Sequence, residues 1–300
     1  MHKIMDFRSD TVTRPSDEMR KVIACAAVGD DIYGDDPSSN ALCEYAAEIT
    51  GKEAAIFACS GTMGNLLAFV AAGRHGESIL AGKRSHVWCA EVGGLSAIAG
   101  LCPYPLDDDE GIPAPEDLSP ANRADGDIHH PETTMLALEN THNFTGGIAV
   151  SPERFARTAR EGRRLGFHVH LDGARIFNAA VKYGVEVSEF TKEVDSVQFC
   201  LSKGLGAPLG SMLCGSHEFI EKAQKMAQTP RRSAAPARHR RGGGALRAQK
   251  QRRAPRGGPR ERAAACGAAA RGRHRRREYA GHDEHGLLPA RRGRRERRGI

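Results

Sequence analysis

Short apolar runs alternate with segments of helical periodicity across the first 229 residues, and this alternation restricts the fold more than any other feature. Six runs have the length of a β-strand; they lie at residues 54–60, 77–82, 134–140, 167–172, 196–202 and 211–215. Between them, one helix is clearly marked, with Ser151 as N-cap, Pro152 in the first turn and Gly166 at the stop. The pattern predicts an α/β fold, with a mostly parallel sheet flanked by helices.

Such sheets bind ligands beyond the carboxyl ends of their strands, and three strand ends here carry chemistry. The first strand run is followed by Ser60, Gly61 and Thr62 and then by a helix. A hydroxyl and free N–H groups at a helix N-terminus suit a phosphate. Taken alone, these residues are better explained as an ordinary N-cap.

The other two strand ends present a carboxylate and an amine. Asp172 follows the run FHVHL and needs a cationic or donor partner, which Arg175 would supply in a plain salt bridge. Lys203 follows the run SVQFCLS, and a buried lysine readily becomes the neutral amine that forms a Schiff base. For an isolated lysine, a surface position is the simpler explanation.

Together, the three strand ends match the needs of pyridoxal 5'-phosphate. Its phosphate requires a helix N-terminus, its ring nitrogen requires a carboxylate that keeps it protonated, and its aldehyde requires a lysine. Small residues follow Lys203 in the string KGLGAP and let this loop approach a bulky cofactor. The sequence therefore predicts a pyridoxal-phosphate site at this edge of the sheet.

The sequence also resembles the low-specificity L-threonine aldolases, which are pyridoxal-phosphate enzymes of the aspartate-aminotransferase fold type. Seven stretches carry the resemblance, in family order from residue 6 to about residue 228: DFRSDTVTRPSDEMR, VGDDIYGDDPS, SGTMGN, SHVWCAEVGG, LENTHNFTGG, HLDGARIFNAAV and SVQFCLSKGLGAPLGS. Other enzymes of this fold type share the aspartate and the lysine but not these strings. The resemblance implies a pyridoxal-phosphate-binding large domain over residues 1–228.

The resemblance implies a role for each residue that matches around the cofactor. Lys203 would hold the cofactor as a Schiff base, Asp172 would pair with the ring nitrogen, and Arg175 would bond the phenolic oxygen. Gly61 and Thr62 would hold the phosphate.

Four further residues are implied near the substrate. His86 would stack on the cofactor ring, and Ser9 would contact the substrate carboxylate. His129 would be a second active-site histidine, although the next residue is also a histidine. Tyr33 would reach the site of a partner subunit in a homodimer or homotetramer, with simple packing as its alternative role.

The implied reaction is cleavage of L-threonine or L-allo-threonine to glycine and acetaldehyde. A base must remove the proton of the β-hydroxyl group while the bond between Cα and Cβ breaks. His86 and His129 are the candidate bases, with His86 slightly favoured and a water molecule as the third option.

The composition changes at about residue 229. Of the 44 lysines and arginines, 23 lie in residues 230–300, together with only 5 of the 37 acidic residues. This segment lacks Val, Phe, Trp and Met, so it buries too little apolar surface to offset the entropy of ordering. We expect a disordered tail over residues 229–300 in place of the family's small domain. A frameshift, an alternative splice or a damaged gene copy would explain it, and we expect little threonine cleavage.

A different class of function is an inactive aldolase-like remnant whose basic tail binds nucleic acid or acidic surfaces non-specifically. Tyr279 is the only aromatic residue among the tail's arginines, which argues against an evolved RNA-binding module. The eight cysteines show neither C-x-x-C nor zinc spacing, which indicates reduced thiols and no metal site. No stretch approaches the ~20 apolar residues of a membrane span, and the first residues show no secretory signal. We therefore expect a cytoplasmic protein without a membrane partner.

Overall fold

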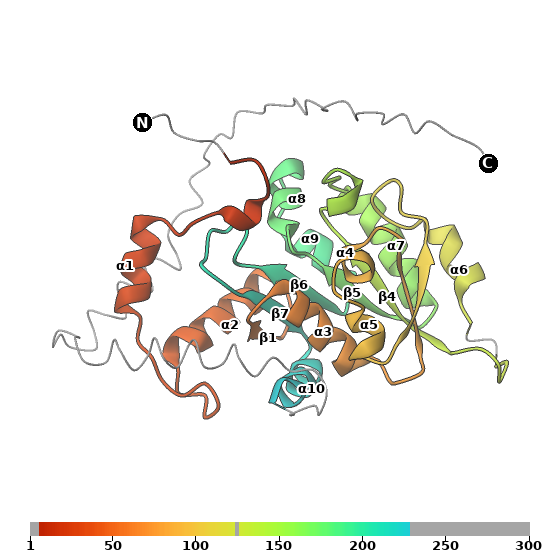
Figure 1. Ribbon diagram of the computed structural model, residues 1–300, viewed down its shortest axis with the longest axis horizontal. Helices are drawn as coiled ribbons and strands as arrows, with labels where there is room; N and C mark the ends of the chain where they lie inside the picture. Colours follow the sequence, from red (N-terminus) through yellow and green to blue (C-terminus); the bar gives the residue numbers. More distant parts are fainter. Residues whose placement is uncertain (1–5, 124–125, 229–300) are drawn as a thin grey trace, which may run out of the picture.

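The computed structural model describes residues 6–123 and 126–228, which form one seven-stranded sheet between two layers of helices (Figure 1). The strands are β1 (Ala54–Ala58), β2 (Ser78–Gly82), β3 (Cys102–Leu106), β4 (Thr133–Glu139), β5 (His168–Asp172), β6 (Ser196–Cys200) and β7 (Ser211–Gly215). Their spatial order is β1-β7-β6-β5-β4-β2-β3. Each of the six expected runs forms a strand. The mostly parallel sheet is confirmed, with β7 running against both of its neighbours.

Strand β3 is the one described strand that the sequence pattern did not predict. It contains Pro103 and Pro105, and proline cannot donate a hydrogen bond to a neighbouring strand. Among the described strands, β3 pairs with β2 alone and forms an edge of the sheet, where proline is tolerated. Two prolines in a run therefore indicate an edge strand here and do not exclude a strand.

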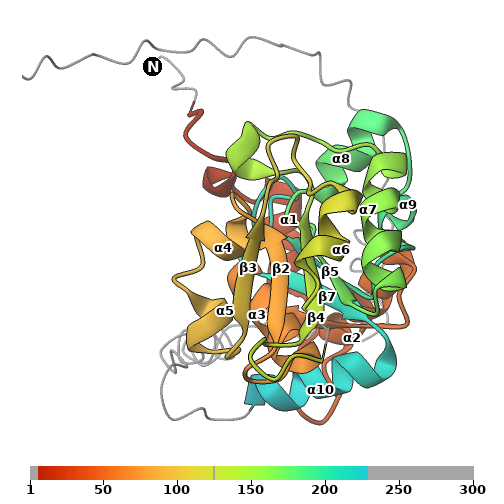
Figure 2. The ribbon, with the colours of Figure 1, turned by 90° about the vertical axis from the view of Figure 1, so that its right-hand side faces the viewer.

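Helices cover both faces of the sheet (Figure 2). The α-helices are α1 (Asp17–Cys25), α2 (Pro37–Thr50), α3 (Gly61–Ala72), α4 (His86–Cys89), α5 (Gly94–Ala97), α6 (Leu118–Ala121), α7 (Pro152–Arg164), α8 (Ile176–Tyr183), α9 (Ser188–Thr191) and α10 (His217–Gln228). Short 3-10 helices are η1 (Asp10–Val12), η2 (Pro115–Asp117) and η3 (Asn143–Thr145). Helices α3, α5 and α10 pack on one face, and α2, α7 and α9 pack on the other. The predicted cap of α7 is confirmed, because the Ser151 side chain accepts the N–H of Arg154.

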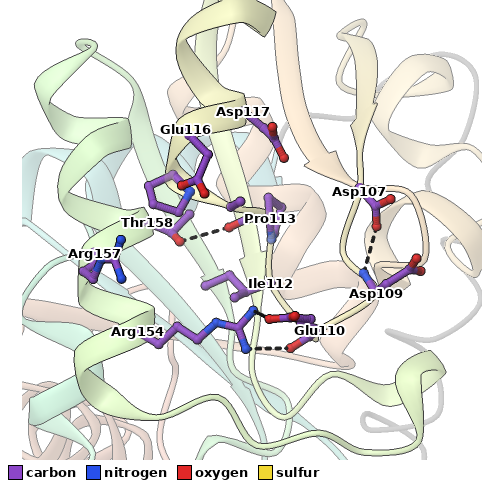
Figure 3. Close-up of a pocket in the computed structure, with 12 residues that line it drawn as sticks. Asp107, Asp109, Glu110, Ile112, Pro113, Glu116, Asp117, Arg154, Arg157 and Thr158 are labelled. Carbon is purple, nitrogen blue, oxygen red and sulfur yellow. Dashed lines mark hydrogen bonds and ion pairs between the residues drawn. The ribbon is translucent and has the colours of Figure 1, made fainter.

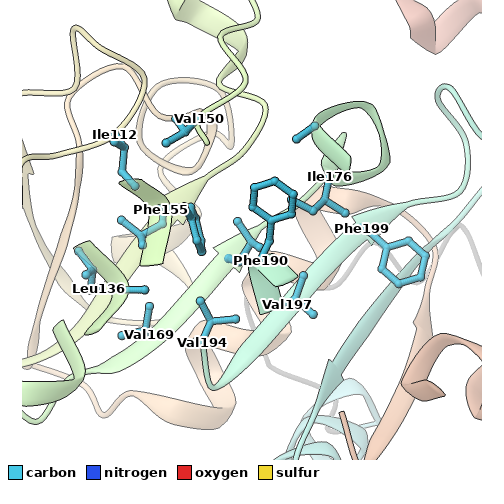
Figure 4. Packing of buried hydrophobic residues seen from close by; sticks show 14 of the residues in the cluster. Ile112, Leu136, Val150, Phe155, Val169, Ile176, Phe190, Val194, Val197 and Phe199 are labelled. Carbon is cyan, nitrogen blue, oxygen red and sulfur yellow. The ribbon is translucent and has the colours of Figure 1, made fainter. Parts of the chain in front are cut away.

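The two faces of the sheet differ in chemistry at its centre. On the α7 face, Val169 and Val197 pack with Phe155 and Phe190 in the main hydrophobic cluster (Figure 4). Side chains alternate along a strand, so the residues on either side of Val169 in β5 face α3 and α10 instead. His170 accordingly makes an edge-on ring contact with a phenylalanine of α3. One strand thus has an apolar face and a buried polar face.

The arginine-rich segment 229–300 lies outside the described residues, and so do the expectations about a disordered tail and its binding. Among the described residues, none of the helices has both the length and the apolar character needed to cross a bilayer.

Candidate active site

Polar side chains gather at one edge of the sheet, where the carboxyl ends of five strands meet. Ser60 follows β1, His86 follows β2 across a short turn, Glu139 ends β4, Asp172 ends β5, and Lys203 follows β6. β1, β2, β4, β5 and β6 run in the same direction, so these ends lie at the same edge. The edge therefore matches the place where the sequence predicted the site.

Asp172 is a buried carboxylate that accepts hydrogen bonds from two other residues. The residue is only 3% exposed to solvent. Oδ1 accepts the N–H of Ala174 at 3.0 Å, and Oδ2 accepts the Asn65 amide at 3.0 Å. Among the described residues, no cation forms a salt bridge with it. The plain salt bridge with Arg175, considered from sequence, is therefore absent from the described part of the chain.

Arg175 instead pairs with Asp10 from the N-terminal segment, through two hydrogen bonds of 2.8 Å. Burial alone would raise the pKa of Asp10, but the bonds and charge of Arg175, with the charge of Lys203, hold it below its usual value. The preceding Ser9 caps η1 by accepting the N–H of residue 11. The Thr13 hydroxyl donates to the backbone carbonyl of Lys203 at 2.6 Å. The N-terminal segment that contains Ser9 is thus held against Arg175 and the backbone of Lys203.

His86 lies among three buried carboxyl groups. Its Nδ1 is 3.0 Å from Glu91 Oε1, and its backbone N–H donates to Glu139 at 2.7 Å. The hydrogen bond to Glu91 raises the pKa of His86 against the effect of burial, with help from the charges of Asp172 and Glu139. Burial and the nearby Asp172 raise the pKa of Glu139 as well. The His86 ring also stacks on Phe144, with the ring centroids 6.3 Å apart.

The start of α3 presents the backbone groups expected for a phosphate. The Ser60 hydroxyl accepts the N–H of Met63 at 3.2 Å and caps the helix. The N–H groups of Gly61 and Thr62 lie in the first turn, where a helix offers them no partner. A Cβ at Gly61 would lie 2.8 Å from Cys200 Sγ, so glycine lets the helix start rest directly on β6.

Two residues implied by the resemblance do not join this group within one chain. His129 is exposed and lies just before β4, in a loop whose Glu132 carbonyl accepts the N–H of Ser78 at the start of β2. It is therefore at the opposite edge of the sheet. Tyr33 is 80% exposed in the loop before α2.

Four residues that sequence reasoning missed lie in the same site: Asn65, Glu91, Glu139 and Asp10. Each lies within a motif that was quoted for the resemblance. For Asn65 a direct signal existed, because it is a single amide in the apolar helix GTMGNLLAFVAA. Buried polar groups need partners, so a lone amide there indicates a polar ligand or side chain facing it.

Two clusters of described residues have side-chain oxygens and nitrogens close enough to share a cation. In the first, ligand atoms of His86, Glu91 and Asp172 all lie within 4.8 Å of one another. The second is the run 107–109. Part of it borders a cavity of about 460 Å³ between α7 and residues 107–117, where Arg154 pairs with Glu110 and Thr158 bonds the Pro113 carbonyl (Figure 3). This cavity is on the α7 face and is separate from the α3 site.

A comparison with protein families identifies the family of this chain. The model of the beta-eliminating lyase family matches residues 6–232. The chain belongs to this family. Members of the beta-eliminating lyase family and the threonine aldolases related to this chain depend on pyridoxal 5'-phosphate.

Relatives among curated proteins point to one branch of the beta-eliminating lyases. The low specificity L-threonine aldolase of Escherichia coli K12 is 45% identical over 221 residues, which cover 73% of this chain and 65% of that protein. Low-specificity L-threonine aldolase 1 of Arabidopsis thaliana is 44% identical over 228 residues, covering 75% and 64%. The chain thus spans just under two thirds of these relatives. The solved threonine aldolase of Leishmania major shares the fold, with a TM-score of 0.65 at 18% identity, covering 73% of this chain and 64% of that one.

The residues of this beta-eliminating lyase fit pyridoxal phosphate. The buried Asp172 lacks an ion-pair partner among the described residues, and a protonated ring nitrogen would supply the missing cation. The first turn of α3 offers unpaired N–H groups to a phosphate. Lys203 lies at the same strand edge in a glycine-containing loop. Charge, helix terminus and amine are therefore all present.

Proposed function

We propose that this chain carries the cofactor site of an aldehyde-lyase that cleaves L-threonine and L-allo-threonine to glycine and acetaldehyde. The observation that carries the proposal is the buried carboxylate of Asp172, which has no salt bridge among the described residues and lies at the same sheet edge as Lys203. The 45% identity to the Escherichia coli aldolase supports the choice of substrate. Such a reaction would degrade threonine and supply glycine.

When bound, pyridoxal phosphate supplies a protonated ring that accepts negative charge as the bond between Cα and Cβ breaks. Asp172 would hold the proton on the ring nitrogen, and its burial would strengthen that interaction because the local dielectric is low. Lys203 would hold the cofactor through its amine. Gly61 and Thr62 would bind the phosphate through backbone N–H groups and the threonine hydroxyl, and Arg175 would bond the phenolic oxygen.

His86 is the base that we favour for the β-hydroxyl proton. It lies within the cluster around Asp172, whereas His129 lies at the other sheet edge and would need a second subunit to take part. The bond from Nδ1 to Glu91 fixes the ring and leaves Nε2 as the nitrogen that exchanges a proton. Glu91 raises the pKa of His86. His86 can accept the β-hydroxyl proton only when its ring is neutral, so its activity as a base should increase as the pH rises through that pKa.

The N-terminal segment would complete the substrate site. Ser9 lies at the start of η1, which Asp10 ties to Arg175, so its hydroxyl is held near the place of the substrate carboxylate. Tyr33 would reach the site of a partner subunit in a homodimer or homotetramer. Its 80% exposure in one chain leaves it available for this contact.

We also propose that residues 1–228 form a cofactor-binding large domain that works in the cytoplasm. The seven described cysteines are all unpaired, which is typical of a reducing compartment. The alternative of an inactive remnant that binds nucleic acid depends on residues 229–300, outside the described part of the chain.

The decisive experiment asks which lysine holds the cofactor. Purified protein is loaded with pyridoxal phosphate, reduced with borohydride and digested, and the modified peptide is identified by mass spectrometry. We expect the label on Lys203, and we expect Lys203→Ala to lose the visible absorbance band. Lys192→Ala is the matched control, because Lys192 is exposed and pairs only with Glu189 in the described structure.

The result is read together with acetaldehyde release from threonine. A label on Lys192 or Lys83 would overturn the assignment of Lys203. Loading without any acetaldehyde release would support the cofactor site and contradict the aldolase activity of this chain.

A further inference from the structure

Asn65, in the second turn of α3, joins two carboxylates of the candidate site. Its Nδ2 lies 2.9 Å from Glu91 Oε1 and 3.0 Å from Asp172 Oδ2. Asn65 is 1% exposed, so these bonds are shielded from water. An ionised carboxylate only accepts hydrogen bonds, so the amide donates one N–H to each acid. The side-chain oxygen of Asn65 must then point the other way.

That oxygen meets a second set of buried side chains on β5 and β6. His170 Nε2 is 3.1 Å from Asn65 Oδ1, and His170 Nδ1 is 2.9 Å from Ser196 Oγ. His168 Nε2 lies 2.9 Å from the same hydroxyl. His170 and Ser196 are both completely buried.

The two carboxylates determine which group donates in each hydrogen bond of this series. Because Asn65 Oδ1 only accepts, His170 must donate through Nε2–H. Burial lowers the pKa of His170 to about 3, so the ring is neutral and its Nδ1 must accept the Ser196 hydroxyl. Ser196 Oγ in turn accepts from His168. The hydrogens thus have one consistent arrangement from β6 to the acids.

We propose that Asn65 is a positioning residue that aligns Asp172 with the cofactor ring nitrogen and Glu91 with His86, and that His170 and Ser196 lock Asn65 in this orientation. The proposal rests on the proposed function. Asn65 acts on the two acids and through Glu91 on His86, whose Nδ1 shares the same carboxylate oxygen.

An amide suits this place better than other side chains. Glu91 and Asp172 contribute ligand atoms within 4.8 Å of one another, so their charges repel. An amide gives each acid a donor without adding charge, and its planar shape fixes the angle between the two bonds. Aspartate would keep the bond from His170 but lose both donors, which makes Asn65→Asp a variant of nearly the same shape and opposite function.

The first test needs no variant. Long-range proton–nitrogen correlation spectra of histidine rings report which nitrogen carries the hydrogen. In the cofactor-free 300-residue protein at neutral pH we expect His170 as the neutral Nε2–H form. A neutral Nδ1–H form or a protonated ring would contradict the arrangement, whether or not the protein is an aldolase.

The second test measures the affinity for pyridoxal phosphate by absorbance titration, and kcat and KM for threonine. In Asn65→Asp and Asn65→Ala we expect affinity to fall by about tenfold or more, since bonds to a charged group are lost. We expect kcat to fall as well, with KM changed by less than about threefold because Ser9 is untouched. The matched control is Thr158→Val, which also removes a buried hydrogen bond but lies on α7.

A third variant tests the lock. Ser196→Ala should weaken cofactor affinity by about twofold to fivefold in the parent but not in the Asn65→Ala background, because its effect passes through Asn65. Additive effects would overturn this part. If the Asn65 variants fail to fold, the spectra and the effect of Ser196→Ala in the parent decide the proposal, and an unchanged cofactor affinity there would overturn it.

The outcomes separate this inference from the proposed function. A parent protein that binds no cofactor contradicts the proposed function. A parent that binds it, with Asn65→Asp and Asn65→Ala folded and within about twofold of its affinity and kcat, overturns the role of Asn65 alone.

Discussion

Asp172 shows how a single buried charge can mark a site. It accepts two hydrogen bonds, yet the nearby guanidinium of Arg175 is bound to Asp10. Burial of a carboxylate costs free energy that donors and cations must offset, and no salt bridge to Asp172 does so among the described residues. A carboxylate kept at that cost suits an electrostatic role toward a bound cation.

Replacing Asp172 by asparagine would test this role. The amide side chain would keep the shape, so we expect Asp172→Asn to bind cofactor but lose the charge that holds the ring proton. Turnover should fall by about two to three orders of magnitude, ~3–4 kcal/mol of transition-state stabilisation. The measurement is kcat for acetaldehyde release at saturating cofactor. Asp195→Asn serves as control, since Asp195 accepts a β5 backbone N–H at the opposite edge. An unchanged kcat in Asp172→Asn would refute the electrostatic role.

The residues that the sequence could predict are those whose role follows from position along one strand. Asp172 and Lys203 were proposed from the sequence because each stands at the end of an apolar run, and the structure places both at one edge of the sheet. The partners Asp10 and Asn65 were not, because pairing of residue 10 with 175, or of 65 with 172, depends on three-dimensional packing. The resemblance supplied motifs around these partners but no role for them.

At the scale of elements, α3 is seated on β6 through a glycine inside the helix. A Cβ at Gly64 would lie 2.6 Å from Gln198 Cγ, which is closer than two carbons can approach. The Gln198 side chain is completely buried and has little room to move. Gly64 therefore sets the distance between the helix that carries Asn65 and the sheet that carries Asp172.

We expect Gly64→Ala to destabilise the protein by about 1–3 kcal/mol through overpacking, although alanine in a helix normally gains about 1 kcal/mol over glycine. Urea unfolding at neutral pH measures the change. Adding Gln198→Ala should recover part of the loss, because the clash is with that side chain. A higher midpoint for Gly64→Ala alone would mean that α3 moves away from β6 freely.

Strand β5 carries a second element-scale property, a pH dependence of stability. Burial lowers the pKa of His170 from 6.5 to about 3, and burial also lowers the pKa of His168. Below a pH of 6.5 the unfolded chain therefore binds protons that the folded chain does not. Stability should fall as the pH drops from about 6.5 toward about 3, by roughly 1.4 kcal/mol per pH unit for His170.

The check is urea unfolding of the parent and of His170→Gln at several pH values between about 7 and about 4. Glutamine does not titrate, so the slope of the unfolding free energy against pH should decrease by the contribution of about one bound proton. His217→Gln, at an exposed histidine, is the matched control for the loss of a histidine. Equal slopes for the parent and His170→Gln would contradict a neutral, buried His170.

Element by element, the sequence pattern predicted every central strand and one of the two edge strands. The runs of β2, β4, β5, β6 and β7 are buried, as expected for the middle of a covered sheet, and the edge strand β1 was predicted from its apolar run as well. Edge strand β3 escaped notice because it needs no full set of donors. For β5 the sequence analysis considered only Asp172 at the end of the strand. The buried His170 could not be given a partner, because its contact with Asn65 of α3 depends on how the helix packs on the sheet.

At the scale of the whole molecule, helix α1 in the N-terminal segment is poorly covered by the described part of the chain. None of the nine residues of α1 is buried, and an isolated helix of this length is unstable in water. Apolar side chains are exposed on this helix and in the loop after it, at Ile23, Val28 and Ile32. The segment is nevertheless tied to the site through the bond of Asp10 to Arg175. A surface that is apolar and adjoins the site suits a second copy of the chain.

We therefore expect the purified protein to be a dimer or tetramer, with the N-terminal segment at the interface and Tyr33 directed toward the neighbouring site. Light scattering after size exclusion measures the mass. Ile23→Lys with Val28→Lys should weaken association by at least about tenfold, because two charges would be buried at the contact. Val181→Lys, on an equally open part of α8, is the matched control and should leave the mass unchanged. A monomeric parent, or a double variant that associates like the parent, would show that α1 is covered in some other way.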